Sequence, residues 1–542
     1  MITLSTALAA DLAAGEKDFV FLVEISGYAN AQAVPIVYAS APLNISGKEV
    51  RSLALPIRDN ASSVSLDAAK ATYAGIGFAI QDKDNEITAR LDDIDFIGKS
   101  VSIKMGTAKT SYADFVNIFL GVITNLGLNA DATAYDFQTT DIQENLSQMV
   151  FRVAKTKITL AFTETDTVIT VESTADFATA GPFSNYETIG ARGYLILGSG
   201  ESAEIIKWTG KTSTTFTGLS RAQLGTLYHA FAIGAEVKEV VIWPGHPLDI
   251  LAVILTGESL EEDINFETVP SGWKVLETLS IDTASWIEAK DRTREILYEY
   301  RTLTAQFIKN FAEGEVMKPL KLFMRSTVGN TIGLVKMIER PIPLAPARQL
   351  NREHLKSDIS WNGQAELLSN RVTVYYDFDV TTGGFLKSRQ VTDIASTARF
   401  GLRNPLEISL KGLREANGGA DLAELIARYH FLMFAAPHPE IGLSVADMRQ
   451  LDMEIGDTLR VTHQILPKLS AGSRGVADHF LKILSKAVRV AGGDIQFKLF
   501  DADIPASNLY ASVAEDGTPD YASATAAQQL ERLFIGQSIR AA

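Results

Sequence analysis

Residues 204–241 constrain the fold most, because short strand-like runs alternate there with turn residues. Glu204–Trp208 and Thr215–Thr217 contain strand-forming side chains, and residues 210–213 between them have turn chemistry. Residues 236–241 close the segment with further β-branched side chains. The segment therefore predicts strand, turn, strand, loop and strand, which is the core of a small β-domain.

Length and composition indicate a folded, multidomain protein. The chain has 542 residues, which corresponds to about three to five domains. Hydrophobic residues make up 46% and charged residues 21% of the chain, as in ordinary globular proteins. The 50 basic and 65 acidic side chains give a net charge of −15. This balance argues against a surface dedicated to nucleic acid, although an acidic wall would suit a channel that repels passing DNA.

The absence of cysteine excludes whole classes of chemistry. Without cysteine there is no disulfide framework, no thiolate metal site and no thiol nucleophile, and a protein assembled in the cytoplasm is expected. The first basic residue is Lys17, so the N-terminus lacks the charged start of a secretory signal. No apolar run approaches the ~18 residues of a membrane span.

The first half of the chain is expected to be mainly β. Residues 1–150 are predicted as one β-rich domain, in which Ser5 caps a short N-terminal helix carrying Leu8 and Leu12. A generic β-domain remains the alternative. Its strands are predicted at 19–25, 101–105, 117–123 and 135–140. Residues 151–242 are predicted as the small β-domain, inserted into a larger one, with further strands at 158–160, 167–171 and 194–197.

The middle of the chain changes character. Residues 243–340 are predicted as an α+β domain, with a helix starting at Pro247 and a longer helix over 282–300 that Asp282 caps. A hairpin is expected from 320–324 and 331–337. Three prolines within residues 341–348 then predict an extended linker.

Residues 349–505 are predicted as a second β-rich domain. Its first strand, 370–379, alternates apolar and polar side chains. Residues 396–403 form a turn-like segment after it, and Asp421 with Glu424 predicts a capping box at the start of a helix. Gly456 and Asp457 precede a strand, and a hairpin over 487–499 ends the domain. Residues 506–542 are predicted as a C-terminal tail.

Two groups of residues resemble a known family. In the loop 221–229, the order Arg221, Gly225, Thr226, His229 after a strand pair is similar to a loop of tailed-bacteriophage baseplate and tail-tip proteins. The second group resembles the central hub proteins of such tails, with Phe400 standing where a tyrosine is expected. It consists of Asn370, Val372, Val374, Tyr376, Ser396, Phe400, Gly401, Arg403, Gly456 and Asp457.

The resemblance covers roughly residues 160–460 and implies a fold and a function. It implies a mainly β multidomain chain with α+β portions, containing two tube-like β-barrel domains and a small inserted β-domain. It also implies a homotrimer that joins the tail tube and the distal tail protein to tail tip or fibre proteins. Its channel holds the tape-measure protein and passes DNA at ejection. The expected location is the virion, without membrane insertion by this chain.

No catalytic pattern competes with this reading. The seven histidines include no His-Glu-x-x-His pair, and there is no Gly-x-Ser-x-Gly elbow and no phosphate-binding loop. Residues 82–86 resemble the start of a calcium loop but lack its glycine and its later glutamate. The acidic clusters at 92–95 and 261–263 are read as exposed loops, with paired glycosidase carboxylates as the alternative. No catalytic, cofactor or metal residue is predicted, and the chain is expected not to be an enzyme.

Candidate interaction residues come from two places. Arg221, Gly225, Thr226 and His229 either hold their own loop together or contact a neighbouring subunit. A receptor- or carbohydrate-binding role through Trp208 and Tyr228 is the alternative function of this domain. In the tail, a predicted helix over 522–534 either frays or docks on the next tail component, through three apolar side chains: Leu530, Leu533 and Phe534.

Overall fold

The computed structural model describes a mainly β, multidomain chain. It describes residues 4–14, 18–30, 32–55, 60–65, 70–73, 75–82, 85–91, 96–130, 133–141, 146–151, 153–177, 193–257, 260, 280–326, 331–336, 348–356, 359–446, 448–468, 473–489, 494–501, 510–513 and 532–533. Two compact units are present. Unit 1 comprises Met1–Asn145, Phe323–Leu367 and Pro437–Pro505, and unit 2 comprises Leu146–Leu322, Leu368–Ala436 and Ala506–Ala542.

These units group the chain differently from the boundaries expected along the sequence. Residues 349–505, which the sequence predicts as one domain, contribute to both units. Each unit is assembled from segments far apart in the chain, so local composition carries little information about where a unit ends. Among the predicted boundaries, the proline-rich linker at 341–348 lies outside the described residues apart from Arg348, which opens a strand.

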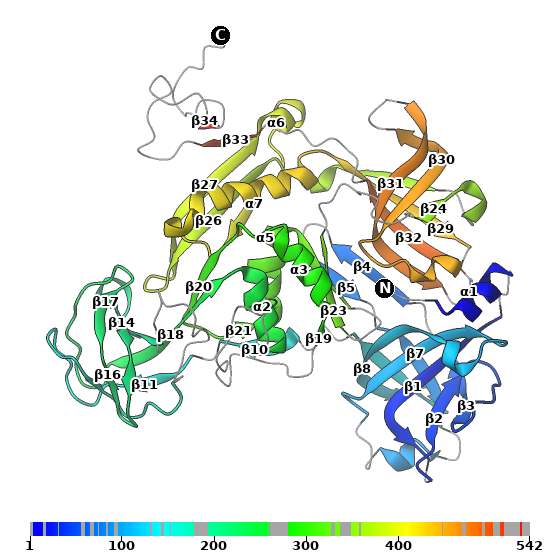
Figure 1. Cartoon of the computed structure of the whole chain (residues 1–542), viewed down its shortest axis with the longest axis horizontal. Helices are drawn as coiled ribbons and strands as arrows, with labels where there is room; N and C mark the ends of the chain where they lie inside the picture. Colours follow the sequence, from blue (N-terminus) through cyan, green and yellow to red (C-terminus); the bar gives the residue numbers. More distant parts are fainter. Residues whose placement is uncertain are drawn as a thin grey trace. The chain divides into compact units, whose positions relative to one another are not determined.

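Unit 1 contains a closed barrel, drawn in blue in Figure 1. Phe21, Val23 and Ile25 alternate along its first strand and point into the core. The four strands predicted in this region are confirmed, and the structure extends each of them. In barrel order, the strands are β1 (Phe19–Ala29), β2 (Pro35–Ala39), β3 (Glu49–Leu55), β6 (Gly77–Gln81), β9 (Ala134–Thr140), β8 (Val116–Leu128) and β7 (Ser100–Thr107).

The N-terminal helix α1 (Thr6–Ala13) packs into the same unit. As predicted, the Ser5 side chain caps it by accepting a hydrogen bond from the Leu8 backbone N–H at 3.1 Å. Leu8 and Leu12 are buried in the unit's main core. The spacing of these leucines on one helix face was sufficient to predict this packing.

The second sheet of unit 1 is built mainly from the C-terminal half of the chain. The hairpin predicted over 487–499 is confirmed, because the end of β31 pairs with β32 across it. A further strand pair from the N-terminal region, β4 (Asn60–Ser65) and β5 (Lys70–Tyr73), joins this sheet through β31. The sheet order is β24 (Arg348–Leu350), β30 (Thr458–Lys468), β31 (Ser473–Arg489), β32 (Asp494–Asp501), β29 (His438–Val445) and β25 (Ser360–Gln364).

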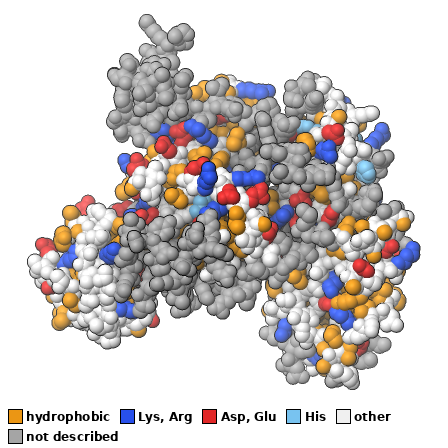
Figure 2. All heavy atoms as spheres, viewed as in Figure 1, with side chains coloured by type: hydrophobic (Ala, Val, Ile, Leu, Met, Phe, Trp, Pro, Cys, Tyr) orange, Lys and Arg blue, Asp and Glu red, His pale blue; other side chains and the backbone are white. Residues whose placement is uncertain are grey.

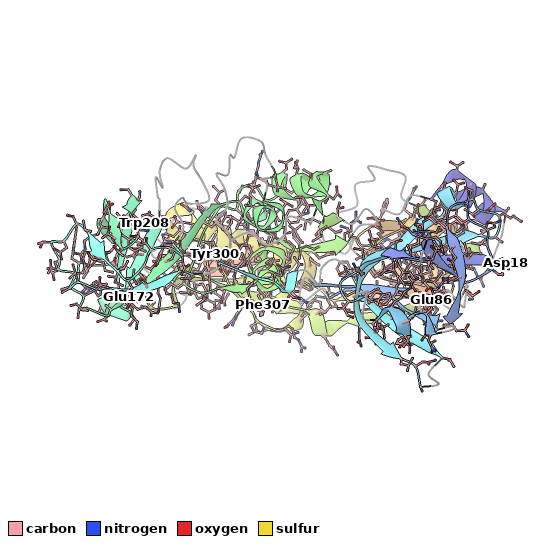
Figure 3. All side chains as sticks on the ribbon, turned by 90° about the horizontal axis from the view of Figure 1, so that it is seen from below. Asp18, Glu86, Glu172, Trp208, Tyr300 and Phe307 are labelled. Atoms are coloured by element: carbon pink, nitrogen blue, oxygen red, sulfur yellow. The ribbon has the colours of Figure 1, made fainter. Side chains whose placement is uncertain are left out.

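Unit 2 contains the small β-domain predicted around residues 204–241. Its core is apolar, and Trp208, labelled in Figure 3, is 2% exposed there. One sheet runs β11 (Lys155–Lys157), β18 (Glu236–Gly245), β13 (Gly193–Leu197), β14 (Glu204–Trp208) and β17 (Ser220–Gln223), and β20 (Tyr298–Thr302) pairs with β18. A smaller sheet contains β12 (Ile169–Thr170), β16 (Thr215–Thr217) and β15 (Gly210–Lys211). Residues 210–211 are thus strand where a turn was predicted, and Ile158 makes only an isolated bridge.

The helical part of unit 2 corrects one prediction. Helix α2 (Pro247–Thr256) forms as expected, but the helix predicted over 282–300 ends as α3 (Thr283–Asp291). Strand β20 begins at Tyr298, because Tyr298 and Tyr300 alternate with more exposed residues and are both buried. Further along are α4 (Ile308–Phe311), a π-helical turn (Ala312–Met317) and α5 (Lys318–Leu320). The predicted strands near 320–337 are present as neighbours, β22 (Leu322–Ser326) and β23 (Thr331–Lys336), which belong to unit 1 apart from Leu322.

The last sheet of unit 2 carries two helices, α6 (Ile394–Phe400) and α7 (Gly419–Phe434). The predicted capping box is wrong, because α7 begins at Gly419 and Glu424 bonds to Arg389 and Arg428 instead. The end of the helix predicted over 522–534 is also wrong, since Leu533 lies in a strand; Leu530 and Phe534 lie outside the described residues. The sheet contains β28 (Leu406–Ser409), β26 (Arg371–Asp379), β27 (Gly384–Asp393), β33 (Tyr510–Val513) and β34 (Arg532–Leu533).

Candidate interaction site

A buried ion pair holds the loop that follows β17. The Arg221 guanidinium donates to both oxygens of Glu204, from Nε to Oε1 at 2.7 Å and from Nη2 to Oε2 at 2.5 Å. Glu204 is fully buried and Arg221 is 9% exposed. Paired geometry of this kind gives the strongest and most directional carboxylate contacts. Glu204 is the first residue of β14, one of the strands from which the small β-domain was predicted. Its pairing with Arg221 was not predicted.

Both members of the pair also bind the backbone of the loop. Glu204 accepts hydrogen bonds from the N–H groups of Ala222 and His229, at 3.2 and 3.0 Å. Arg221 donates to the carbonyl oxygens of Thr163 and His229. Its guanidinium lies 4.1 Å from the centre of the Phe162 ring, which adds a cation–π contact. The pair is therefore saturated by its own domain, and the subunit contact suggested for Arg221 stays a prediction.

The other residues of the sequence pattern shape the same loop. Gly225 has φ +83°, a left-handed conformation that glycine adopts without strain. The Thr226 hydroxyl accepts from the Ile205 N–H at 3.0 Å and donates to the Gln223 carbonyl at 2.8 Å. His229 contributes its backbone, and its Nε2 is buried without a hydrogen-bond partner. Gly225, Thr226 and His229 are thus brought together with Arg221; their predicted role in contacting another protein stays a prediction.

Exposed apolar side chains surround this loop. We call them the apolar crest: Leu160, Leu224, Leu227, Tyr228 and Ile233. Leu227 is 69% exposed and Tyr228 is 55% exposed, with its ring 5.5 Å from the Arg221 guanidinium. The segments of Leu160 and Ile233 are joined by backbone bonds between Phe162 and Phe231. Figure 2 shows apolar side chains on the surface of this part of the chain.

The crest was only partly foreseen. Tyr228 was proposed as a glycan contact together with Trp208, but Trp208 packs inside the domain, 5.3 Å from Phe216 between ring centres. Trp208 is therefore not available as a surface stacking residue. Leu224 and Leu227 were not predicted as contact residues, although large apolar residues in a turn-rich loop indicate a surface that another molecule covers.

Four residues of the second pattern group meet around Asn370, whereas Gly456 and Asp457 belong to unit 1. The Asn370 side chain is fully buried and donates from Nδ2 to the Ser396 hydroxyl at 3.2 Å and to the Gly401 carbonyl at 2.7 Å. Its Oδ1 accepts from the Arg403 N–H at 2.9 Å. We call these four residues the Asn370 node. The node links the start of β26 to both ends of α6. It brings together residues that are 31 to 33 positions apart in the sequence.

Replacing Asn370 by alanine is expected to destabilise this part of unit 2 by about 1–3 kcal/mol, because a fully buried side chain that makes three hydrogen bonds, to Ser396, Gly401 and Arg403, is lost. Hydrogen exchange of peptides from β26 and α6, followed by mass spectrometry, measures the loss of local protection. Asn417 is exposed, so Asn417→Ala is the control and should change protection by less than about 0.5 kcal/mol. Equal protection in the two variants would contradict the structural role of the node.

Other site types find no support in the described part of the chain. No cluster of three or more metal-binding side chains occurs among the residues that the structure describes. Within the same residues, no helix is long and apolar enough to cross a membrane. The acidic clusters at 92–95 and 261–263 lie outside the described residues.

Comparisons with known proteins return tail proteins among solved structures. No protein-family model matches the chain, and neither does any curated protein. The 43 kDa tail protein of prophage MuSo2 from Shewanella oneidensis is 9% identical, with a TM-score of 0.36 over 90% of this chain and 99% of that chain. A tail protein from Neisseria meningitidis is 10% identical, with a TM-score of 0.35 over 89% and 96% of the two chains. The structural neighbours are thus phage tail proteins, at a degree of likeness that carries no argument about function.

Proposed function

We propose that the chain is a structural component of a phage-type tail and acts as the central hub of its baseplate or tip. The Asn370 node carries this proposal. Four of the residues matched to hub proteins by their order along the chain form one hydrogen-bonded feature around the buried Asn370 side chain. A mainly β chain with a closed barrel suits a protein whose task is assembly, since such sheets form rigid walls.

In this proposal, three copies form a ring around the tail axis. The ring connects the tail tube and the distal tail protein to tail tip or fibre proteins, and its channel holds the tape-measure protein until DNA passes. A net charge of −15 supports a wall that does not retain DNA. The work of the protein is assembly and gating in the virion, without catalysis.

The apolar crest is proposed as a contact with a neighbouring copy. Leu227 and Tyr228 are more than half exposed, and they stand on a loop that the Glu204–Arg221 pair fixes from beneath. A rigid loop loses little conformational entropy when it binds. Exposed aromatic and leucine side chains of this kind are typical of the cores of subunit interfaces.

Mass photometry of the full chain tests both parts of the proposal. At micromolar concentration we expect particles of three times 58.8 kDa and a threefold ring in negative-stain images. Replacing Leu227 and Tyr228 together by serine should weaken assembly at least tenfold. Leu386 is 64% exposed on β27, so Leu386→Ser is the control and should leave assembly unchanged.

The outcomes separate the two claims. A stable monomer of the unaltered chain, with no tail protein bound to it, would contradict the hub function. A trimer that survives the serine replacements would retain the hub and remove the crest from the contact between copies.

A further inference from the structure

Three basic side chains meet where α5 and α7 pack together in unit 2. His430 lies in the last turns of α7, Lys318 opens α5, and Lys321 follows its last residue. His430 is 5% exposed and Lys321 is 2% exposed. Lys321 and His430 both lie against the ring of Phe434, and burial and the charges of both lysines lower the pKa of His430.

The imidazole of this cluster has no hydrogen-bond partner. Both ring nitrogens of His430 are buried without a hydrogen bond. Phe434 stacks on the face of the imidazole, with ring centres 4.6 Å apart, so the edge that carries the nitrogens is left uncovered by this ring. The Lys321 Nζ lies 5.5 Å from the centre of the same Phe434 ring. No hydrogen bond or ion pair of Lys318 or Lys321 side chains occurs in the described part of the chain.

The buried carboxylates of this region are engaged elsewhere. Glu424 accepts from Arg389 at 3.0 Å and from Arg428 at 2.6 Å. Glu315, ahead of α5, accepts from the Lys411 N–H at 3.0 Å. Neither carboxylate is therefore placed to neutralise Lys321. A buried ammonium without a counter-ion is strongly unfavourable, and an added anion relieves that penalty.

The pKa shifts of Lys321 and His430 agree with a site that binds an anion. Burial, together with the neighbouring Lys318 charge, lowers the pKa of Lys321 to about 7. Burial also lowers the pKa of His430, as do the two lysines. Near neutral pH these side chains can take up protons when an anion binds. Their positive charge then offsets the negative charge of the anion.

We propose that Lys318, Lys321 and His430 form a binding site for a small oxyanion of the phosphate or carboxylate class. Lysine binds such oxygens as a compact point charge, and the imidazole edge supplies a directional N–H donor. The aromatic wall of Phe434 keeps the local dielectric low and strengthens the attraction. This site is independent of the proposed hub function, because it needs no second copy.

Thermal unfolding of the full chain measures binding, with inorganic phosphate or acetate added at constant ionic strength. In the unaltered chain, the Tm should rise and then saturate as the anion is increased. Lys321→Met should abolish this rise and should begin from a higher Tm, because an apolar side chain replaces an unpaired buried ammonium. Lys387 is exposed on β27, so Lys387→Met should respond as the unaltered chain does. If Lys321→Met does not fold, His430→Phe serves in its place.

Two further measurements identify the chemical class of the anion and the pH dependence of its binding. Saturation at a lower concentration of phosphate than of acetate indicates a ligand of the phosphate class, and the reverse order indicates a carboxylate. Acetate should bind about tenfold more tightly at pH 6 than at pH 8, since Lys321 must be protonated to hold it. A Tm that rises linearly and equally in all variants would overturn the proposal, as would binding unaffected by Lys321→Met.

Discussion

Replacing Glu204 by glutamine is expected to destabilise the small β-domain by about 3–5 kcal/mol, because Arg221 then keeps an uncompensated buried charge. The amide has nearly the same shape, so the change isolates charge from packing. Hydrogen exchange of peptides from β13, β14 and β17 reports the free energy of local opening. This readout reports on the small β-domain alone, whereas the Tm of the full chain combines both units.

An exposed pair in the same domain is the matched control. Glu236 and Lys238 lie 2.8 Å apart, with side chains that are 48% and 34% exposed. Glu236→Gln should therefore cost no more than about 1 kcal/mol. Equal losses of protection in the two variants would mean that the buried pair contributes no more than a surface pair.

Replacing both partners separates charge from hydrogen bonding. In the double variant Glu204→Leu with Arg221→Met, no unpaired charge remains, so stability should partly recover. Recovery should be incomplete, because the N–H groups of Ala222 and His229 lose the carboxylate that accepts from them. A double variant as unstable as Glu204→Gln would contradict the account of an uncompensated charge.

The sequence predicted elements well where one periodicity decided the structure. The alternation in β26 and the leucine spacing in α1 gave correct strands and helices, because these patterns report burial directly. Residues 282–300 failed for the opposite reason: after α3 ends, Tyr298 and Tyr300 alternate over too few residues to signal a strand. The α7 cap failed because Glu424 is claimed by Arg389, a partner 35 residues away.

The candidate site was predictable only in part, for a similar reason. The order of Arg221, Gly225 and Thr226 indicated a fixed loop, and Gly225 does adopt a positive φ. Arg221 is buried because it pairs with Glu204. This pairing depends on the register of β14 and β17. Lys321 follows α5 and His430 lies in α7 of the same unit, and no spacing along the sequence indicates that they meet.

The Gly456→Ala substitution is expected to have the second large effect, in unit 1. Gly456 has φ +86°, and a Cβ at this position would lie 2.0 Å from Cγ1 of Val335 and 3.1 Å from Cζ of Phe323. The left-handed backbone costs an alanine roughly 1–2 kcal/mol. Moving Val335 adds about 1–3 kcal/mol. Hydrogen exchange of β30 and β31 measures the loss, because the Gly456 N–H bonds to the Ile483 carbonyl at 2.8 Å.

Two further variants show whether the left-handed backbone or the contact with Val335 contributes more to the loss. Gly127 lies in β8 with an ordinary φ and with open space where a Cβ would stand, so Gly127→Ala should be neutral or slightly stabilising. In a Val335→Ala background the 2.0 Å clash with Cγ1 is removed, and the Cβ of residue 335 and Cζ of Phe323 remain at 3.1 Å. Gly456→Ala should then cost little more than the backbone term of roughly 1–2 kcal/mol. An undiminished cost in that background would place the whole effect in the backbone and exclude a steric role for Val335. That result would leave the left-handed turn before β30 as the sole reason for glycine at this position.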